Sequence, residues 1–220
     1  KQFSINDRPF QHGKDIFVIG NNENKFFESN EIVFIGYGID DPKYSDISGL
    51  DLHNKIVMLI NENEPTDEKG NSWISSKKTA SDWATTRNKK VKEILKHNPK
   101  MVLAINSQLS QLLEDAGDRA IEGRYNLAVD QPAPEKSAMI PVVNITDHAA
   151  NYILNLARTN LATVVAKINR TGKPNSFVIS TNFKAEFGTN AAALADPNIL
   201  GYLGGTDKKD EIVVIGGHYD

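Results

Sequence analysis

The stretch ASDWATTRNKKVKEILKHNPKMVLAI, residues 80–105, decides the fold class. Apolar side chains in its first part recur at helical spacing and Asn98-Pro99 supplies a stop, so we expect one helix from Ala80 to His97. The apolar run Met101–Ile105 then predicts a buried strand. A helix that leads directly into a strand is typical of α/β proteins.

The elements predicted around this stretch are also short strands and helices. Runs rich in β-branched and aromatic residues indicate the strands, and apolar residues at helical spacing indicate the helices. This order predicts an α/β fold of the mixed, α+β kind. We expect strands at Glu31–Ile39, Lys55–Ile60, Ala138–Ile145, Leu161–Ile168 and Ser176–Phe187, and helices at Ser107–Gly117 and Thr146–Ala157.

The composition limits the class of protein. The 220 residues include 25 Lys and Arg, 28 Asp and Glu, 40% hydrophobic residues and no cysteine. A net charge of −3 argues against general nucleic-acid binding, and no apolar run approaches the roughly 20 residues that a membrane span needs. Without cysteine, a metal site would have to use His, Asp or Glu. The length suggests one large domain or two small ones.

The end of the sequence carries the strongest pattern. Asn198–Leu203 and Glu211–Ile215 are apolar runs that flank a polar, glycine-containing turn, so we expect a β-hairpin there. The second run leads into Gly216-Gly217-His218-Tyr219-Asp220. A histidine at a strand end can bind a metal, and a carboxylate two residues later can orient its ring. His218 and Asp220 are therefore the candidate site residues.

The segment NILGYLGGTDKKDEIVVIGGHYD, residues 198–220, resembles the opening of the catalytic domain in zinc-dependent aminopeptidases related to bacterial leucyl aminopeptidase and glutamate carboxypeptidase. The resemblance implies that His218 is a ligand in a two-zinc site and that Asp220 orients it. It also implies that the other ligands and the glutamate that acts as general base follow residue 220. We therefore expect no catalytic residue within the 220 residues, and no peptidase activity from this chain alone.

A second resemblance involves EIVFIGYGIDDPKYSDISGLDLHNKIVMLINENEP, residues 31–65. It is similar to the start of the protease-associated domain that many of these peptidases carry, with Asn54 in place of a usual turn glycine. The two resemblances together predict an N-terminal segment at 1–30, a protease-associated domain at 31–169 and the start of the catalytic domain at 170–220. The inserted domain would form a wall or lid of the substrate cleft.

The function expected from these resemblances is that of a hydrolase that removes N-terminal residues from peptides, with zinc as cofactor and a peptide as substrate. The alternative is a non-catalytic, receptor-like or protein-interaction module of the same architecture. The resemblance, and a start at Lys1 without an initiator methionine, suggest an exported protein, periplasmic or secreted. The sequence leaves the oligomeric state and the preferred substrate residue open.

A glycine motif and four further histidines are the remaining candidate sites. Gly36-Tyr37-Gly38 resembles the start of a dinucleotide fingerprint, but Asp41 stands at the third glycine position and no helix follows at once. We therefore expect no dinucleotide site there. The other histidines have no partner at ligand spacing and are expected at the surface or at helix ends: His12, His53, His97 and His148.

Overall fold

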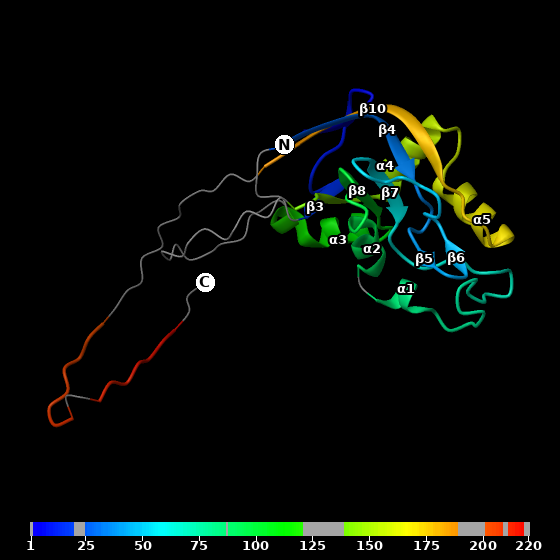
Figure 1. The fold of residues 1–220 in the computed structure, drawn as a ribbon. Helices are drawn as coiled ribbons and strands as arrows, with labels where there is room; N and C mark the ends of the chain where they lie inside the picture. The colour runs from blue at the N-terminus through cyan, green and yellow to red at the C-terminus, as the bar shows by residue number, and fades with distance from the viewer. Residues whose placement is uncertain are drawn as a thin grey trace. The chain divides into compact units, whose positions relative to one another are not determined.

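A computed structural model gives the fold of the protein and describes residues 2–19, 25–86, 88–120, 139–188, 201–208 and 211–217 (Figure 1). The chain divides into two compact units, Lys1–Thr189 and Asn190–Asp220. The first unit is built on a mixed sheet of eight strands with helices packed against it. The mixed α/β class predicted from the sequence is confirmed.

The eight strands lie in the order β2-β1-β10-β4-β7-β8-β9-β3, where the numbers follow the chain. The pairs β4–β7, β7–β8 and β8–β9 are parallel, and the remaining pairs are antiparallel. The strands are β1 (Gln2–Ile5), β2 (Arg8–Pro9), β3 (Ile16–Ile19), β4 (Lys25–Phe34), β7 (Ile56–Ile60), β8 (Met101–Ile105), β9 (Val142–Ile145) and β10 (Phe177–Phe187). Separately, β5 (Asp40–Asp41) and β6 (Tyr44–Ser45) form a small antiparallel pair.

The position of each strand follows from its residues. Every residue of β7 and β8 is buried, as parallel strands covered on both faces require. The long strand β10 instead alternates between buried and more exposed residues, which suits an antiparallel strand with one solvated face. It runs beside β4 over most of its length (Figure 1).

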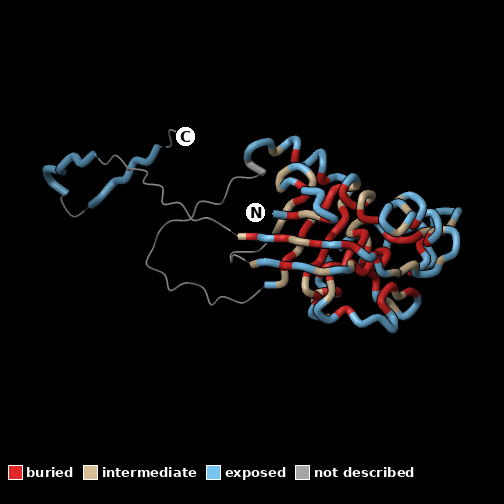
Figure 2. Tube along the Cα trace, turned by 90° about the horizontal axis from the view of Figure 1, so that it is seen from above, coloured by how far each residue is buried: buried red, intermediate tan, exposed pale blue. Residues whose placement is uncertain are grey.

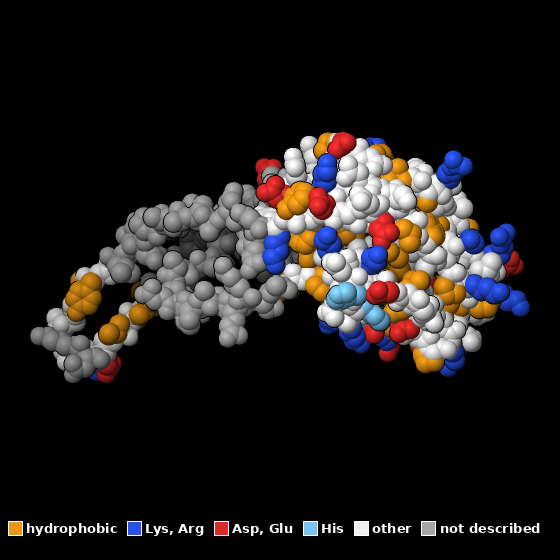
Figure 3. Space-filling model, turned by 45° about the horizontal axis from the view of Figure 1, so that its top comes forward, with side chains coloured by type: hydrophobic (Ala, Val, Ile, Leu, Met, Phe, Trp, Pro, Cys, Tyr) orange, Lys and Arg blue, Asp and Glu red, His pale blue; other side chains and the backbone are white. Residues whose placement is uncertain are grey.

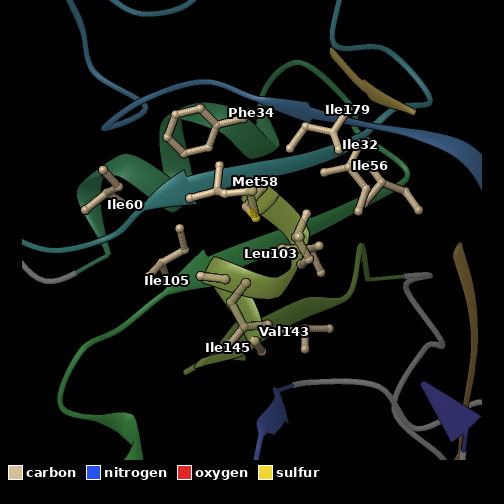
Figure 4. Packing of buried hydrophobic residues seen from close by; sticks show 14 of the residues in the cluster. Ile32, Phe34, Ile56, Met58, Ile60, Leu103, Ile105, Val143, Ile145 and Ile179 are labelled. Carbon is tan, nitrogen blue, oxygen red and sulfur yellow. The ribbon is translucent and has the colours of Figure 1, made fainter. Parts of the chain in front are cut away.

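The main core lies on one face of the sheet. Helices α4 (Asp147–Leu156) and α5 (Leu161–Thr171) contribute to it, with Ile153 and Ile168 fully buried. Figure 4 shows how apolar side chains from neighbouring strands meet in this core. The labelled residues are Ile32, Phe34, Ile56, Met58, Ile60, Leu103, Ile105, Val143, Ile145 and Ile179.

The opposite face carries a smaller core. Ile94 of helix α2 (Lys89–Leu95) packs there against alternate strand residues such as Leu59 and Val102. Beside it, helix α3 (Leu109–Ala116) packs against Phe17 of β3. A single turn, α1 (Asp82–Thr85), precedes α2, and a 3₁₀ turn spans Gly117–Ala120.

The single helix predicted from Ala80 to His97 is wrong, because the segment forms the two short helices α1 and α2. Thr86 closes α1 in an extended conformation, and Asn88 adopts a left-handed conformation with φ 60°. Asparagine is among the few residues that accept this conformation, which cannot continue a helix. The apolar residues of the segment follow helical spacing on both sides of Asn88, so their spacing gives no sign of the break there.

The strand predicted at Leu161–Ile168 is also wrong, because these residues form the first part of α5. Val164 and Ile168 are its buried residues, four positions apart, which is helical spacing. The side chain of Asn160 caps the start by accepting a hydrogen bond from the backbone N–H of Thr163, and Gly172 ends the helix in a left-handed conformation. The capping residues therefore distinguish a helix from a strand in this segment.

The compact unit extends beyond the boundaries predicted for the middle domain. The boundary at 30/31 lies inside β4, and the boundary at 169/170 lies inside α5. Strand β10 pairs with both β1 and β4, so the chain before residue 31 and the chain after residue 170 belong to the same sheet. Pairing between strands that are far apart in the sequence sets the bounds of the unit, and local composition does not reveal such pairing.

The hairpin predicted at residues 198–215 is not present in the part of it that the structure describes. Residues 201–208 and 211–217 contain no strand and are exposed along their length (Figure 2). The apolar run Ile212–Ile215 is 84 to 94% exposed. An isolated two-stranded hairpin is marginal in water, so apolar runs on either side of a turn do not by themselves ensure one.

Candidate functional site

The two residues predicted to form the metal site, His218 and Asp220, lie outside the described residues. The run that precedes them, Ile212–Gly217, is described and exposed. The assignment of a zinc ligand and of its orienting carboxylate therefore stays a prediction from the sequence.

Within the described ranges of the chain, no group of three or more His, Asp or Glu side chains is placed to hold a metal ion. His148, predicted at the surface, is exposed and lies 3.1 Å from the guanidinium of Arg8 through its Nε2. The ring of His12 stacks on Phe17 at a centroid distance of 5.2 Å.

The carboxyl ends of three parallel strands meet at one edge of the sheet. Ile60, Ile105 and Ile145 are register partners at the ends of β7, β8 and β9. The Glu62 carboxylate accepts hydrogen bonds from Ser107, 2.7 Å from Oγ and 3.3 Å from the backbone nitrogen. Burial, and then the nearby Glu62, raise the pKa of Asp147, the first residue of α4. This edge is where open α/β sheets hold their ligands.

Lys90 of α2 is a buried cation at this edge, with 2% of its surface exposed. Its ammonium group donates to the backbone oxygens of Ile60 at 3.3 Å and Glu62 at 2.9 Å, and to that of Asn63. Burial lowers the pKa of Lys90 to about 7, against the opposing effect of nearby carboxylates. All three of its donors are used, so Lys90 ties α2 to the chain that leaves β7.

Asp46 is the buried anion of the same region and is also 2% exposed. Its Oδ2 accepts from the backbone N–H groups of Tyr37 and Ile39 at 3.1 Å, and its Oδ1 accepts from the Tyr44 hydroxyl at 2.8 Å. Burial raises the pKa of Asp46 to about 6, although its hydrogen bonds act in the opposite direction. Burial, with Asp46 nearby, also raises the pKa of Tyr37 to about 12 and the pKa of Tyr44 further.

The Gly36-Tyr37-Gly38 turn is shaped around this carboxylate. Gly36 has φ +59°, and a Cβ there would lie 2.6 Å from Oδ1 of Asp46. Gly38 has φ +65° and packs against Leu59. The two glycines let the backbone wrap a side chain of the protein itself, which explains the motif without a nucleotide.

A groove opens on the sheet face that α2 and α3 partly cover. It has a volume of about 520 Å³. Asn144 and Phe17 point to this face because their strand neighbours, such as Val143 and Ile16, belong to the core on the other face. The groove is lined by Phe17, Asn61, Trp83, Ala84, Thr85, Thr86, Asn88, Lys89, Lys90, Asn106, Leu109, Leu112, Leu113, Ala116 and Asn144.

Four asparagines are among the polar residues that line the groove. Asn61 and Asn144 are half-buried, and their side chains make no hydrogen bond to any residue that the structure describes. The Asn106 side chain accepts from the backbone N–H of Gln108 at 3.0 Å through its oxygen, which leaves its NH₂ group available. The ammonium group of Lys89 lies 4.4 Å from the centre of the Trp83 ring. Among the residues that the structure describes, the lining contains two lysines and no carboxylate.

The sequence predictions did not identify the residues of this groove. A signal was present, since the apolar runs of β7 and β8 both end in Ile-Asn, at Ile60-Asn61 and Ile105-Asn106. An asparagine after a strand is usually a turn residue, so the sequence alone does not mark these two as binding residues. Only the parallel pairing shows that the two asparagines belong to neighbouring strand ends.

Comparisons with protein-family models, curated proteins and solved structures give no match for this chain. None of the described helices is long and apolar enough to cross a membrane. On the face shown in Figure 3, acidic and basic side chains are interspersed with hydrophobic ones.

Proposed function

We propose that this chain is part of a zinc-dependent aminopeptidase, a hydrolase that releases N-terminal residues from peptides. The observation that carries the proposal is the ordered motif of residues 198–220, which ends in Gly216-Gly217-His218-Tyr219-Asp220. An imidazole with a carboxylate two residues later suits zinc as a donor and its orienting partner. A bound pair of zinc ions polarises the scissile carbonyl and lowers the pKa of a bound water.

In this proposal His218 is a zinc ligand and Asp220 orients its ring. The remaining ligands and the general base would come from residues that follow Asp220. The sheet unit Lys1–Thr189 would act as a wall or lid of the substrate cleft, and would take part in selecting the peptide. Export to the periplasm or the medium belongs to the same proposal.

A second candidate function is a non-catalytic module that binds peptides or proteins. The groove beside α2 favours it, because half-buried amides and apolar side chains are typical of ligand-binding pockets. The two candidates differ in the sequence that follows residue 220. A Glu-Glu pair, a further Asp and a final His would support the enzyme, and their loss would support the binding module.

The test of the enzyme proposal is the substitution His218→Ala in the longer protein that the proposal requires. We expect loss of bound zinc and of aminopeptidase activity, measured by metal analysis and by release of an N-terminal residue from a chromogenic substrate. Asp220→Asn should weaken zinc binding about 10- to 100-fold, because an orienting partner contributes that much. The 220-residue chain alone should show no turnover and bind zinc no tighter than micromolar.

The control is His53→Ala, which removes an exposed histidine of the sheet unit and should change neither zinc content nor activity. Full activity in His218→Ala, or turnover by the 220-residue chain with added zinc, would rule out the proposal.

A further inference from the structure

We propose that the groove beside α2 binds the carboxyl-terminal end of a short, extended peptide. The amides of Asn61, Asn106 and Asn144 would pair with its peptide groups, and Lys89 would face its terminal carboxylate. This deepens the proposed function and rests on it only in taking a peptide as the ligand. The groove would hold the end of the peptide that an aminopeptidase does not cut.

The parallel sheet sets the positions of the three amides. Asn61 and Asn106 each follow one of the register partners Ile60 and Ile105, so they leave neighbouring strands at the same level. Asn144 pairs with Ala104 on the next strand. Ala104 and Asn144 lie two residues before the level of Asn106, on the same face, and neighbouring strands are about 4.8 Å apart, so the three amides lie on a diagonal across the strand ends. An extended peptide that crosses these ends can meet them one after another.

The chemistry of the amides selects the ligand. A side-chain amide offers two N–H donors and a carbonyl acceptor, which complement the C=O and N–H of a peptide group. The protein residues described give the side chains of Asn61 and Asn144 no hydrogen-bonding partner, so both amides are open to a ligand. A ligand that covers them without pairing with them would incur the cost of unmade hydrogen bonds. An apolar ligand would leave both amides unpaired. A ligand made of peptide groups would satisfy donor and acceptor together.

The rest of the lining favours an apolar side chain and a negative charge. Phe17, Leu109 and Leu113 form one wall, and all three belong to the same apolar cluster. In the described part of the lining there are Lys89 and Lys90 but no carboxylate, so the groove favours a carboxylate over an amino group. The donors of Lys90 are already bound to carbonyl oxygens, so Lys89 is the cation that would face the ligand. The volume falls within the roughly 300–1,000 Å³ of small-ligand pockets.

The experiment measures binding of acetyl-Ala-Ala-Leu, with a free carboxylate, and of its C-terminal amide to the 220-residue chain by isothermal titration calorimetry. We expect the acid to bind about tenfold more tightly than the amide, because a charge-assisted hydrogen bond is lost on amidation. Asn144→Ala should weaken binding of both about fivefold through loss of one hydrogen-bonding partner. Lys89→Gln should abolish the preference for the acid. Asn155→Ala, on the exposed side of α4, is the matched control and should change neither affinity.

Two results would overturn this inference: no binding of the acid, or binding that neither Asn144→Ala nor Lys89→Gln alters. Thermal unfolding of each variant checks that it folds. If Asn144→Ala does not fold, Lys89→Gln still tests the inference. Acetylation protects the peptide from an aminopeptidase, so the measurement does not depend on hydrolysis. Failure to bind would leave the zinc proposal intact, and an active His218→Ala enzyme would leave the groove intact.

Discussion

Asp46 and Lys90 are ionisable side chains that the fold buries almost completely. Each forms hydrogen bonds mainly with backbone groups. Asp46 holds the turn at Gly36-Tyr37-Gly38 and Lys90 holds the chain after β7. A buried charge is costly unless hydrogen bonds satisfy it, and here backbone groups supply most of those bonds. At the scale of single residues, these side chains stabilise the region next to the groove and are not available to a ligand.

The glycine at position 36 is therefore expected to tolerate no side chain. Gly36→Ala places a Cβ 2.6 Å from the Asp46 carboxylate at φ +59°, and we expect a loss of about 3 kcal/mol in the free energy of unfolding. Gly49→Ala is the matched control, because it has φ +76° but no atom within 4 Å of the added Cβ, and should cost about 1 kcal/mol. Urea unfolding measures both. Equal losses would show that the contact with Asp46 does not matter.

The helices show how far local patterns predict an element. For α4, Thr146 precedes the apolar residues, and the structure has the predicted helix with Thr146 as its cap. For α5, the capping residues Asn160 and Gly172 were equally visible in the sequence, but the apolar residues between them also fit a strand. Short apolar runs are ambiguous in this way, and the caps carry the deciding information.

The cap of α5 can be tested directly. The Asn160 side chain accepts a hydrogen bond of 2.9 Å from the backbone N–H of Thr163, so Asn160→Ala should lower the free energy of unfolding by about 1 kcal/mol. Asn155→Ala, at an exposed position within α4, should have little effect or a slightly stabilising one, since alanine is the better helix former. Thermal unfolding followed by circular dichroism compares the two. No difference between them would contradict the role of Asn160.

The stability of the sheet unit as a whole should depend on pH through Asp46 and Lys90. The pKa of Asp46 rises from 3.8 to about 6 on folding, so the folded state binds its proton more tightly. Its contribution to the free energy of unfolding then falls as pH rises from about 4 to about 6. The pKa of Lys90 falls from 10.5 to about 7, so its contribution rises with pH between about 7 and 10.5.

The difference in the free energy of unfolding between wild type and a variant isolates the contribution of each side chain. We expect the stability of Lys90→Met to rise less than that of wild type above pH 7, and that of Asp46→Asn to fall less between pH 4 and pH 6. Chemical unfolding at a series of pH values measures both differences. If the free energies of unfolding of wild type and Lys90→Met changed in parallel above pH 7, the lowered pKa of Lys90 would be contradicted.

The sequence by itself determined the mixed α/β class, the buried strands Ile56–Ile60 and Met101–Ile105, the helix after Thr146, and the motif that ends in His218 and Asp220. These depend on side chains close together in the chain, whose spacing is readable without a structure. Only the tertiary structure decided that β10 joins β1 and β4 in one sheet, that Asp46 fills the turn at Gly36, and that three asparagines share one groove. Such contacts join residues far apart in sequence, and the packing of the whole sheet selects them.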